Sequence, residues 1–189
     1  LVSDKLNFPN LSMVGVDDRA AAYQAVSYLI QQGHRKIAVL GGPATSHPSM
    51  MRRQGAQQAM EDAGIRFEDK LYGLSNYDFE SAYHAMNGLL ARRAEFTALF
   101  AMSDVIAFGA IRALVSAGLR VPEDVSVIGF DGITMSRYCV PVMTTIVQPS
   151  EQIALQSIEL LVRQIEHGTP AQTVTLQPEL QQGESVRAI

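Results

Sequence analysis

The sequence predicts an α/β protein built on a doubly wound parallel sheet, and two observations support this prediction. First, short apolar runs alternate along the chain with segments whose apolar residues recur every three or four positions, a pattern typical of strands alternating with helices. Second, polar residues follow two of these runs: Ser103 and Asp104 after 97–102, and Asp131 after 125–130. Parallel strands joined by right-handed crossovers bring their carboxyl ends to one rim, where open α/β folds bind ligands.

The elements follow in order from these patterns. Uninterrupted apolar runs predict buried strands at 13–16, 36–40, 72–74, 97–102, 125–130, 145–147 and 173–176. Apolar residues at helical spacing predict helices around 22–30, 56–63, 79–90, 107–114 and 158–165. Glycines in position to end a helix follow four of these segments, at Gly33, Gly64, Gly118 and Gly168. Residues 1–12 are predicted to be a loop, and the polar tail from Gln177 shows no strand or helix pattern.

Composition and charge narrow the range of functions. A chain of 189 residues has room for one large domain or two small ones. Its net charge is -4 and it has no block of Lys and Arg, so we expect no direct nucleic-acid binding. The lone Cys139 excludes an internal disulfide framework and fits a reducing compartment. No apolar run approaches the roughly 20 residues of a membrane helix. The chain begins at Leu1 without a signal-like segment, and we interpret it as a fragment.

Motifs of the common α/β enzymes are absent from the sequence. There is no G-x-G-x-x-G after a strand, no phosphate-binding P-loop, no G-x-S-x-G and no Cys/His cluster with metal-ligand spacing. The glycines of Gly41-Gly42-Pro43 are too few for a dinucleotide site. We therefore predict that the protein is not an enzyme and that it has no cofactor, no metal site and no catalytic residues.

Four segments resemble the signatures of the lactose-repressor/galactose-repressor regulators. Residues 121–131, VPEDVSVIGFD, are the strongest match, since the family pattern there is VPxDvSViGfD. Residues 33–43 (GHRKIAVLGGP), 98–110 (ALFAMSDVIAFGA) and 141–148 (PVMTTIVQ) resemble three further signatures. The segments occur in the family's order and cover roughly residues 13 to 180.

The resemblance implies a periplasmic-binding-protein-like fold whose N-terminal subdomain is incomplete. In this interpretation residues 1–34 and 148–175 are a remnant of the N-terminal subdomain, and residues 35–147 and 176–189 form the C-terminal subdomain. The chain would cross between the subdomains near residues 33–34, 146–148 and 176–178.

The resemblance also implies a function. We expect an effector-sensing domain, binding a sugar or sugar derivative, from a bacterial DNA-binding transcription regulator; a nucleoside is the less favoured effector. The alternative is a sugar-binding protein of a transport system with the same fold. Operator DNA would be bound only through an N-terminal domain that this chain lacks. The resemblance further implies a homodimer, a cytoplasmic location and no membrane association.

Five residues are candidates for effector binding. Asp131, the strongest candidate, ends a strand, and its carboxylate can accept hydroxyl hydrogen bonds; the less favoured alternative is a turn residue before Gly132. By resemblance, Arg52 projects into the site from the helix after Pro43, whereas Arg53 points about 100° away.

The other three candidates have open alternatives. Tyr77 is placed by resemblance to stack on the effector, but Phe79 competes for this role and either could belong to the core. Ser103 replaces the family's usual Asn, and Gln148 could contact the effector or only the crossing. For Asp104 we expect helix capping rather than ligand contact. Two histidines lie nearby in sequence: we expect a structural role for His34, and His47 could line the site.

Overall fold

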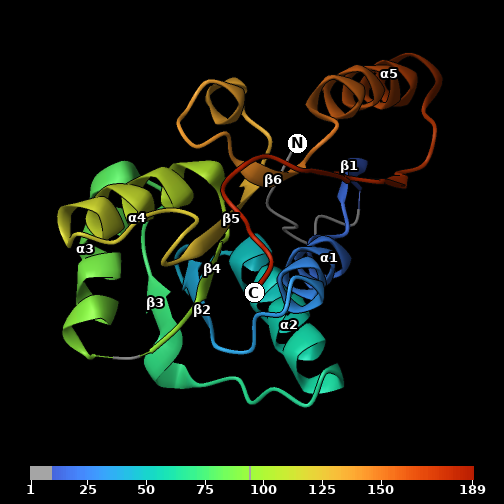
Figure 1. The fold of residues 1–189 in the computed structure, drawn as a ribbon. Helices are drawn as coiled ribbons and strands as arrows, with labels where there is room; N and C mark the ends of the chain where they lie inside the picture. The colour runs from blue at the N-terminus through green and yellow to red at the C-terminus, as the bar shows by residue number, and fades with distance from the viewer. Residues whose placement is uncertain (1–9, 94) are drawn as a thin grey trace.

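The computed structural model describes residues 10–93 and 95–189. Strands and helices alternate as the apolar patterns predict (Figure 1). The strands are β1 (Met13–Val16), β2 (Ile37–Gly41), β3 (Tyr72–Leu74), β4 (Ala98–Ala101), β5 (Ser126–Asp131), β6 (Thr144–Val147), β7 (Thr173–Leu176) and β8 (Glu179–Gln181). The α-helices are α1 (Asp18–Gln31), α2 (His47–Asp62), α3 (Phe79–Ala91), α4 (Asp104–Ser116) and α5 (Ser150–His167). Short 3-10 helices span Asp69–Leu71 and Thr134–Arg137, and most of the predicted loop, residues 1–9, lies outside the described residues.

A six-stranded sheet forms the centre of the larger part of the molecule. Its strand order is β3-β2-β4-β5-β6-β8, and the first five strands of this order run parallel while β8 is antiparallel to β6. Helices α1 and α2 pack together on one face of the sheet, and α3 and α4 pack together on the other (Figure 1). The central strands are buried along almost their whole length, as expected when helices cover both faces. The prediction of a doubly wound α/β fold is confirmed.

A second, smaller unit contains β1, β7 and α5. Strands β1 and β7 form a parallel two-stranded sheet, and α5 packs on it through a core of its own, made by Val14, Val16, Ile153 and Leu160. Figure 1 shows this unit to one side of the six-stranded sheet. The remaining large apolar side chains of α5 are exposed, namely Leu155, Ile158, Leu161, Val162 and Ile165. The small unit therefore presents an uncovered apolar stripe along one helix.

The structure corrects the predicted position of the first chain crossing. Helix α1 was assigned with residues 1–34 to the smaller unit, but its buried residues belong to the large core and it packs along α2. The chain therefore leaves the small sheet directly after Val16 and not near residues 33–34. The chain passes between the two units again between β6 and α5 and between β7 and β8.

The tail is also more ordered than its polar composition indicates. Residues 179–181 form β8 at the edge of the large sheet. Beyond it, Ser185 is fully buried: its hydroxyl donates to the carbonyl of Val127 and accepts the N–H of Thr144. The strand pairing and these hydrogen bonds fasten the end of the chain to β5 and β6. Within the described residues, none of the helices is long and apolar enough to cross a membrane.

Candidate functional site

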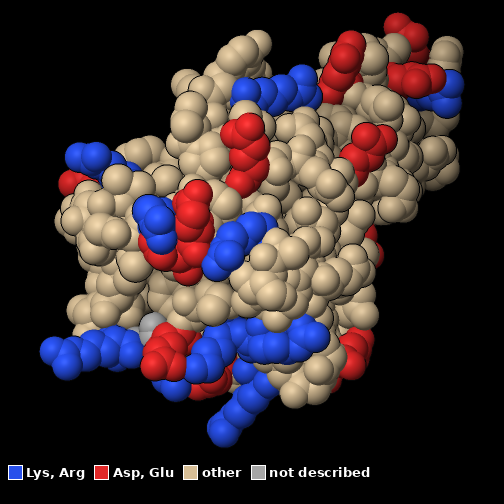
Figure 2. Space-filling view, in the orientation of Figure 1, with Lys and Arg blue, Asp and Glu red and all other residues tan. Residues whose placement is uncertain are grey.

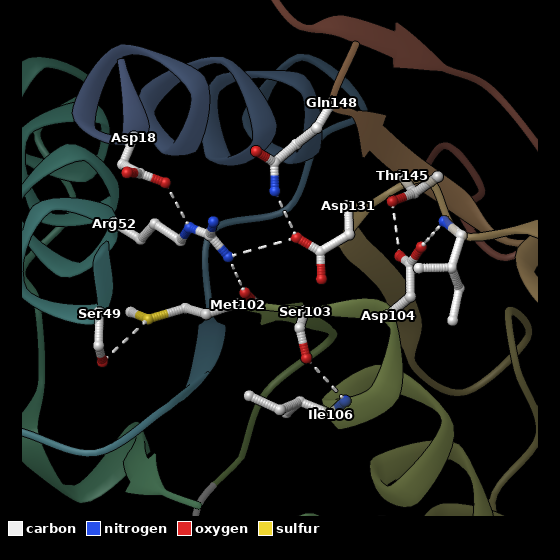
Figure 3. A network of polar contacts seen from close by, with 11 residues as sticks. Asp18, Ser49, Arg52, Met102, Ser103, Asp104, Ile106, Asp131, Thr145 and Gln148 are labelled. Carbon is white, nitrogen blue, oxygen red and sulfur yellow. Dashed lines mark hydrogen bonds and ion pairs between the residues drawn. The ribbon is translucent and has the colours of Figure 1, made fainter. Parts of the chain in front are cut away.

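The carboxyl ends of the parallel strands bring three of the five candidate residues together at one rim. Asp131 is the last residue of β5, and Gln148 directly follows β6. Arg52 reaches the same rim from α2, the helix that follows β2. Helix α2 begins at His47 with Pro48 in its first turn, a position where the missing N–H of proline costs no hydrogen bond. Figure 3 shows the three side chains as members of one connected set of polar contacts.

Arg52 is held from several sides. Its Nε donates to Oδ1 of Asp18 at 2.8 Å, and its Nη1 donates to the backbone carbonyl of Met102. Its guanidinium carbon lies 3.6 Å from the centre of the Phe130 ring, a cation–π geometry. Nη1 also lies 3.7 Å from Oδ1 of Asp131, close enough for an ion pair but too far for a hydrogen bond. The guanidinium is thus oriented by the protein before any effector arrives.

Asp131 combines an unusual backbone with a partly exposed carboxylate. Its φ of 113° is rare for a residue with a side chain, and such strain is concentrated at functional sites. Oδ1 accepts a hydrogen bond from Nε2 of Gln148 at 2.7 Å, while the other carboxylate oxygen points away from both Gln148 and Arg52 (Figure 3). Burial raises the pKa of Asp131 to about 6, against the opposing effects of Arg52 and Gln148. One oxygen of Asp131 therefore remains available to a ligand.

Ser103 and Asp104 both make hydrogen bonds within the protein. Ser103 caps α4, since its hydroxyl accepts the N–H of Ile106 at 3.1 Å. Asp104, which we expected to be the cap, is fully buried; it accepts the hydroxyl of Thr145 at 2.6 Å and the N–H of Ile133 at 2.8 Å. Burial raises the pKa of Asp104, and these hydrogen bonds oppose the rise. Asp104 thus joins α4 to β6 and to the loop after β5.

Tyr77 does not join this set of contacts. Its ring packs directly over Gly42, where a Cβ atom would overlap it, and its φ is 60°. Its hydroxyl is buried and has no hydrogen-bond partner among the described residues, and the same holds for Nδ1 of His47. Phe79, the rival aromatic, is half exposed and lines a different, apolar cavity with Phe108. The stacking role of Tyr77 stays a prediction.

Sequence reasoning missed Asp18, although a signal was present. Two adjacent carboxylates, Asp17 and Asp18, precede a helix, and only one of them can cap it. Asp17 does so, accepting the N–H groups of Arg19 and Ala20. The other acid is then left for a distant partner, and that partner is Arg52. Phe130 was assigned only to a buried strand, and its contact with Arg52 needs the fold to be seen.

His34 lies beside the start of β4, at the amino end of the sheet, and not at this rim. His34 is buried, with Nδ1 2.9 Å from Oγ1 of Thr97 and Nε2 3.2 Å from the carbonyl of Arg187. Its structural role is therefore as predicted, and burial lowers its pKa. In the ranges 10–93 and 95–189, no group of three or more His, Cys, Asp and Glu side chains is placed to hold a metal ion.

Comparison with known proteins identifies the family. Residues 26–186 match the family described as periplasmic binding protein-like domain. The chain is 38% identical over 174 residues to the HTH-type transcriptional regulator MalR of Clostridium butyricum, covering 92% of this chain and 52% of that protein. It is 38% identical over 156 residues to the HTH-type transcriptional repressor CytR of Escherichia coli, covering 82% of this chain and 46% of that protein. The chain thus spans about half the length of these curated relatives.

A solved structure agrees in fold as well as in sequence. A complex of the transcriptional regulator CelR with cellobiose superposes with a TM-score of 0.92 at 33% identity, covering 97% of this chain and 57% of that chain. The similarity in sequence and in fold leads to one assignment: the chain belongs to the periplasmic binding protein-like domain family and corresponds to part of the effector-binding core of LacI-family regulators.

Proposed function

We propose that this chain is the effector-sensing part of a DNA-binding transcription regulator, and that its effector is a sugar or sugar derivative. The observation that carries this proposal is the pair formed by Arg52 and Asp131. A cationic donor and an anionic acceptor stand 3.7 Å apart at the ligand-binding rim of the sheet. A sugar hydroxyl both donates and accepts hydrogen bonds, so vicinal hydroxyls match such a pair.

The relatives support this proposal in two ways. Those compared above are named as transcriptional regulators and not as enzymes, so we assign no reaction to the site. The complex with cellobiose contains a polyhydroxylated ligand of the kind that the Arg52–Asp131 pair suits. Ser103 and Tyr77 remain proposed effector contacts, the first through its hydroxyl proton and the second through its ring. A nucleoside is the second effector class, and stacking on Tyr77 would favour it.

The proposed mechanism rests on the chain crossings. We assign β1, α5 and β7 to an N-terminal subdomain and the six-stranded unit to a C-terminal one. Gln148 lies at the crossing between β6 and α5 and donates to Asp131. An effector that binds Asp131 therefore acts next to a hinge, and it favours whichever subdomain orientation it binds more tightly.

DNA binding is assigned to a part of the regulator outside this chain, and the cytoplasm is the proposed location. Figure 2 shows Lys and Arg side chains standing beside Asp and Glu on the face in view, rather than forming a continuous basic surface. With a net charge of -4, the chain itself does not match the charge that operator DNA attracts.

A homodimer is the proposed assembly. Three large apolar side chains on the loop after β5 are mostly exposed: Met135 at 60%, Tyr138 at 77% and Val140 at 94%. Met135 and Val140 line an apolar cavity of about 640 Å³ that is formed chiefly by α4 and this loop. A projecting apolar loop next to an apolar hollow on the same face suits an isologous contact between two copies.

A binding screen tests the proposed function. Sugars and nucleosides are screened by thermal shift, and affinities are then measured by calorimetry on wild type, Arg52→Ala and Arg53→Ala. We expect Arg52→Ala to weaken binding by about ten- to a hundred-fold, the effect of losing a charge-assisted hydrogen bond. Arg53 is the matched control: it lies one position round the helix, stacks over Tyr72 and pairs with Asp69. Equal losses in both variants would place the site elsewhere.

A further inference from the structure

One contact at the site joins Arg52, a candidate for effector binding, to Asp18, which is not a candidate. Asp18 and Arg52 form an ion pair at 2.8 Å, and their side chains are only 12% and 7% exposed. Exposed ion pairs contribute little, but a pair this well shielded from water strongly constrains both partners. Asp18 is not needed for capping, because Asp17 caps α1. Its carboxylate is therefore committed to Arg52.

The backbones of α1 and α2 fix the distance between these two residues. A Cβ atom at Gly55 would overlap the backbone carbonyl of Arg19. Helices α1 and α2 thus touch backbone to backbone one turn away from Arg52 and one residue from Asp18. This close approach holds the two backbones that carry Asp18 and Arg52 next to each other.

The contact with Asp18 also determines which N–H donors of Arg52 remain free for a ligand. A guanidinium has five N–H donors in a rigid planar fork. Asp18 takes the Nε donor and the Met102 carbonyl takes one Nη1 donor. The plane is set by these two bonds and by the Phe130 ring. The guanidinium consequently stops 3.7 Å short of Asp131 and does not close onto it as a bidentate pair.

We propose that Asp18 is a positioning residue: it holds Arg52 away from Asp131 and thereby keeps both groups free for the effector. Without Asp18, the nearest carboxylate to Arg52 is Asp131. The two effector-binding groups would then satisfy each other, and a ligand would have to break their pair before binding. Since α1 starts immediately after the crossing from β1, the same residue links the first hinge strand to the binding group.

The first test needs no ligand, so it stands apart from the proposed function on which the inference rests. The Nε–H proton of Arg52 is followed by NMR in the 189-residue chain, together with the titration of the Asp131 carboxyl carbon. Four groups act on Asp131, namely Arg52, Gln148, Asp104 and Asp18. In Asp18→Ala we expect the Arg52 proton to lose its protection from solvent exchange and the Asp131 titration to move to lower pH.

Two further variants separate positioning from general destabilisation. Asp17→Ala removes the α1 cap and so lowers stability, but it leaves the Asp18–Arg52 contact intact. Asp18→Asn keeps an oxygen that can accept from Nε while removing the charge. We expect both NMR signatures to be unchanged in Asp17→Ala, and Asp18→Asn to retain most of the protection of the Arg52 proton. Unchanged signatures in Asp18→Ala, or equal changes in Asp17→Ala, would overturn the proposal.

The second test uses the regulator at its full natural length, with cellobiose and adenosine as probes of the two effector classes. We expect Asp18→Ala to weaken binding of the probe that wild type accepts by about ten-fold, and Asp17→Ala to weaken it by less than about two-fold. Equal affinities of Asp18→Ala and wild type would refute the positioning role. If wild type binds neither probe, the proposed effector classes fail, while the NMR result still decides the role of Asp18.

Discussion

The guanidinium of Arg52 stacks over Phe130, the residue immediately before Asp131. One strand end therefore both orients the cationic group of the site and supplies its anionic group. Phe130 and Asp131 are adjacent on β5, whereas Arg52 is held from α2 by its contacts with Asp18 and the Met102 carbonyl. A shift of this strand end would therefore change the distance between the guanidinium and the carboxylate.

Effector binding should depend on pH through Asp131. Its pKa is raised to about 6 by burial, and the ionised form is the better acceptor for hydroxyl donors. Affinity should be constant above about pH 7 and fall by up to about ten-fold for each unit below about pH 6, as protons compete with the effector. Calorimetry across this range measures the slope. Asp131→Asn should bind more weakly at neutral pH and show no such slope; a slope that persists in this variant would assign the titration to another group.

The same carboxylate should lower the stability of the protein at neutral pH. A folded pKa of about 6, above the ordinary value of 3.8 for an aspartate, means that this group's stabilising contribution is fully present below pH 3.8 and is lost as pH rises through 6. Asp131→Asn should therefore unfold at higher urea concentration near pH 7, by an amount on the order of 2 kcal/mol. The difference from wild type should shrink as pH falls towards 4. A variant less stable than wild type at pH 7 would show that the Arg52 attraction outweighs the burial of Asp131.

His34 should lower the stability of the protein as the pH falls, whereas Asp131 should raise it. Burial lowers its pKa below 6.5, so the folded state favours the neutral ring. The contribution of His34 is then fully present above pH 6.5 and is lost as pH falls through the lower, folded pKa. His34→Gln retains a hydrogen-bonding side chain without this titration. We expect it to flatten the decline of stability between about pH 6.5 and about pH 5 in urea unfolding, compared with wild type. An unchanged slope would contradict a neutral, buried His34.

The isolated chain should self-associate through α5. The exposed stripe includes Ile158 at 61% and Ile165 at 75%, and β1 and β7 have only each other as partners within the described residues. Uncovered apolar surface and free strand edges favour association. Sedimentation velocity should show larger species that Ile158→Glu combined with Ile165→Glu reduces. The control is Val140→Glu, on the other apolar surface: if it alone abolishes association, the contact lies at the loop after β5.

Local patterns predicted most of the fold because the central strands are buried on both faces. An uninterrupted apolar run such as 125–130 has few alternatives when helical patterns flank it. The stripe at 22–30 indicated a buried helix equally well, but it could not say which of two sheets buries it, and α1 was placed in the wrong unit. Strand β8 was missed because an edge strand of three residues at the surface has no apolar run.

The candidate site likewise contains residues that could be predicted from the sequence and one that could not. Asp131 and Gln148 follow strands, so their rim position could be inferred from the topology, and Arg52 came from the resemblance. Asp18 lies 34 positions before Arg52 in the chain, and no periodicity connects them. Contacts of this kind depend on how two helices pack, which the sequence specifies only through details such as the absence of a side chain at Gly55.

The backbone angle of Asp131 limits how this receptor can change its ligand over evolution or by redesign. A φ of 113° is readily adopted by glycine, is tolerated by Asp and Asn, and is energetically unfavourable for bulky or branched residues. Few residue types can occupy this position, and of Gly, Asp and Asn only Asp carries a charge. New specificities in this lineage should therefore arise by substitution at Ser103, Tyr77 or Gln148, around a carboxylate that the main chain itself keeps in place.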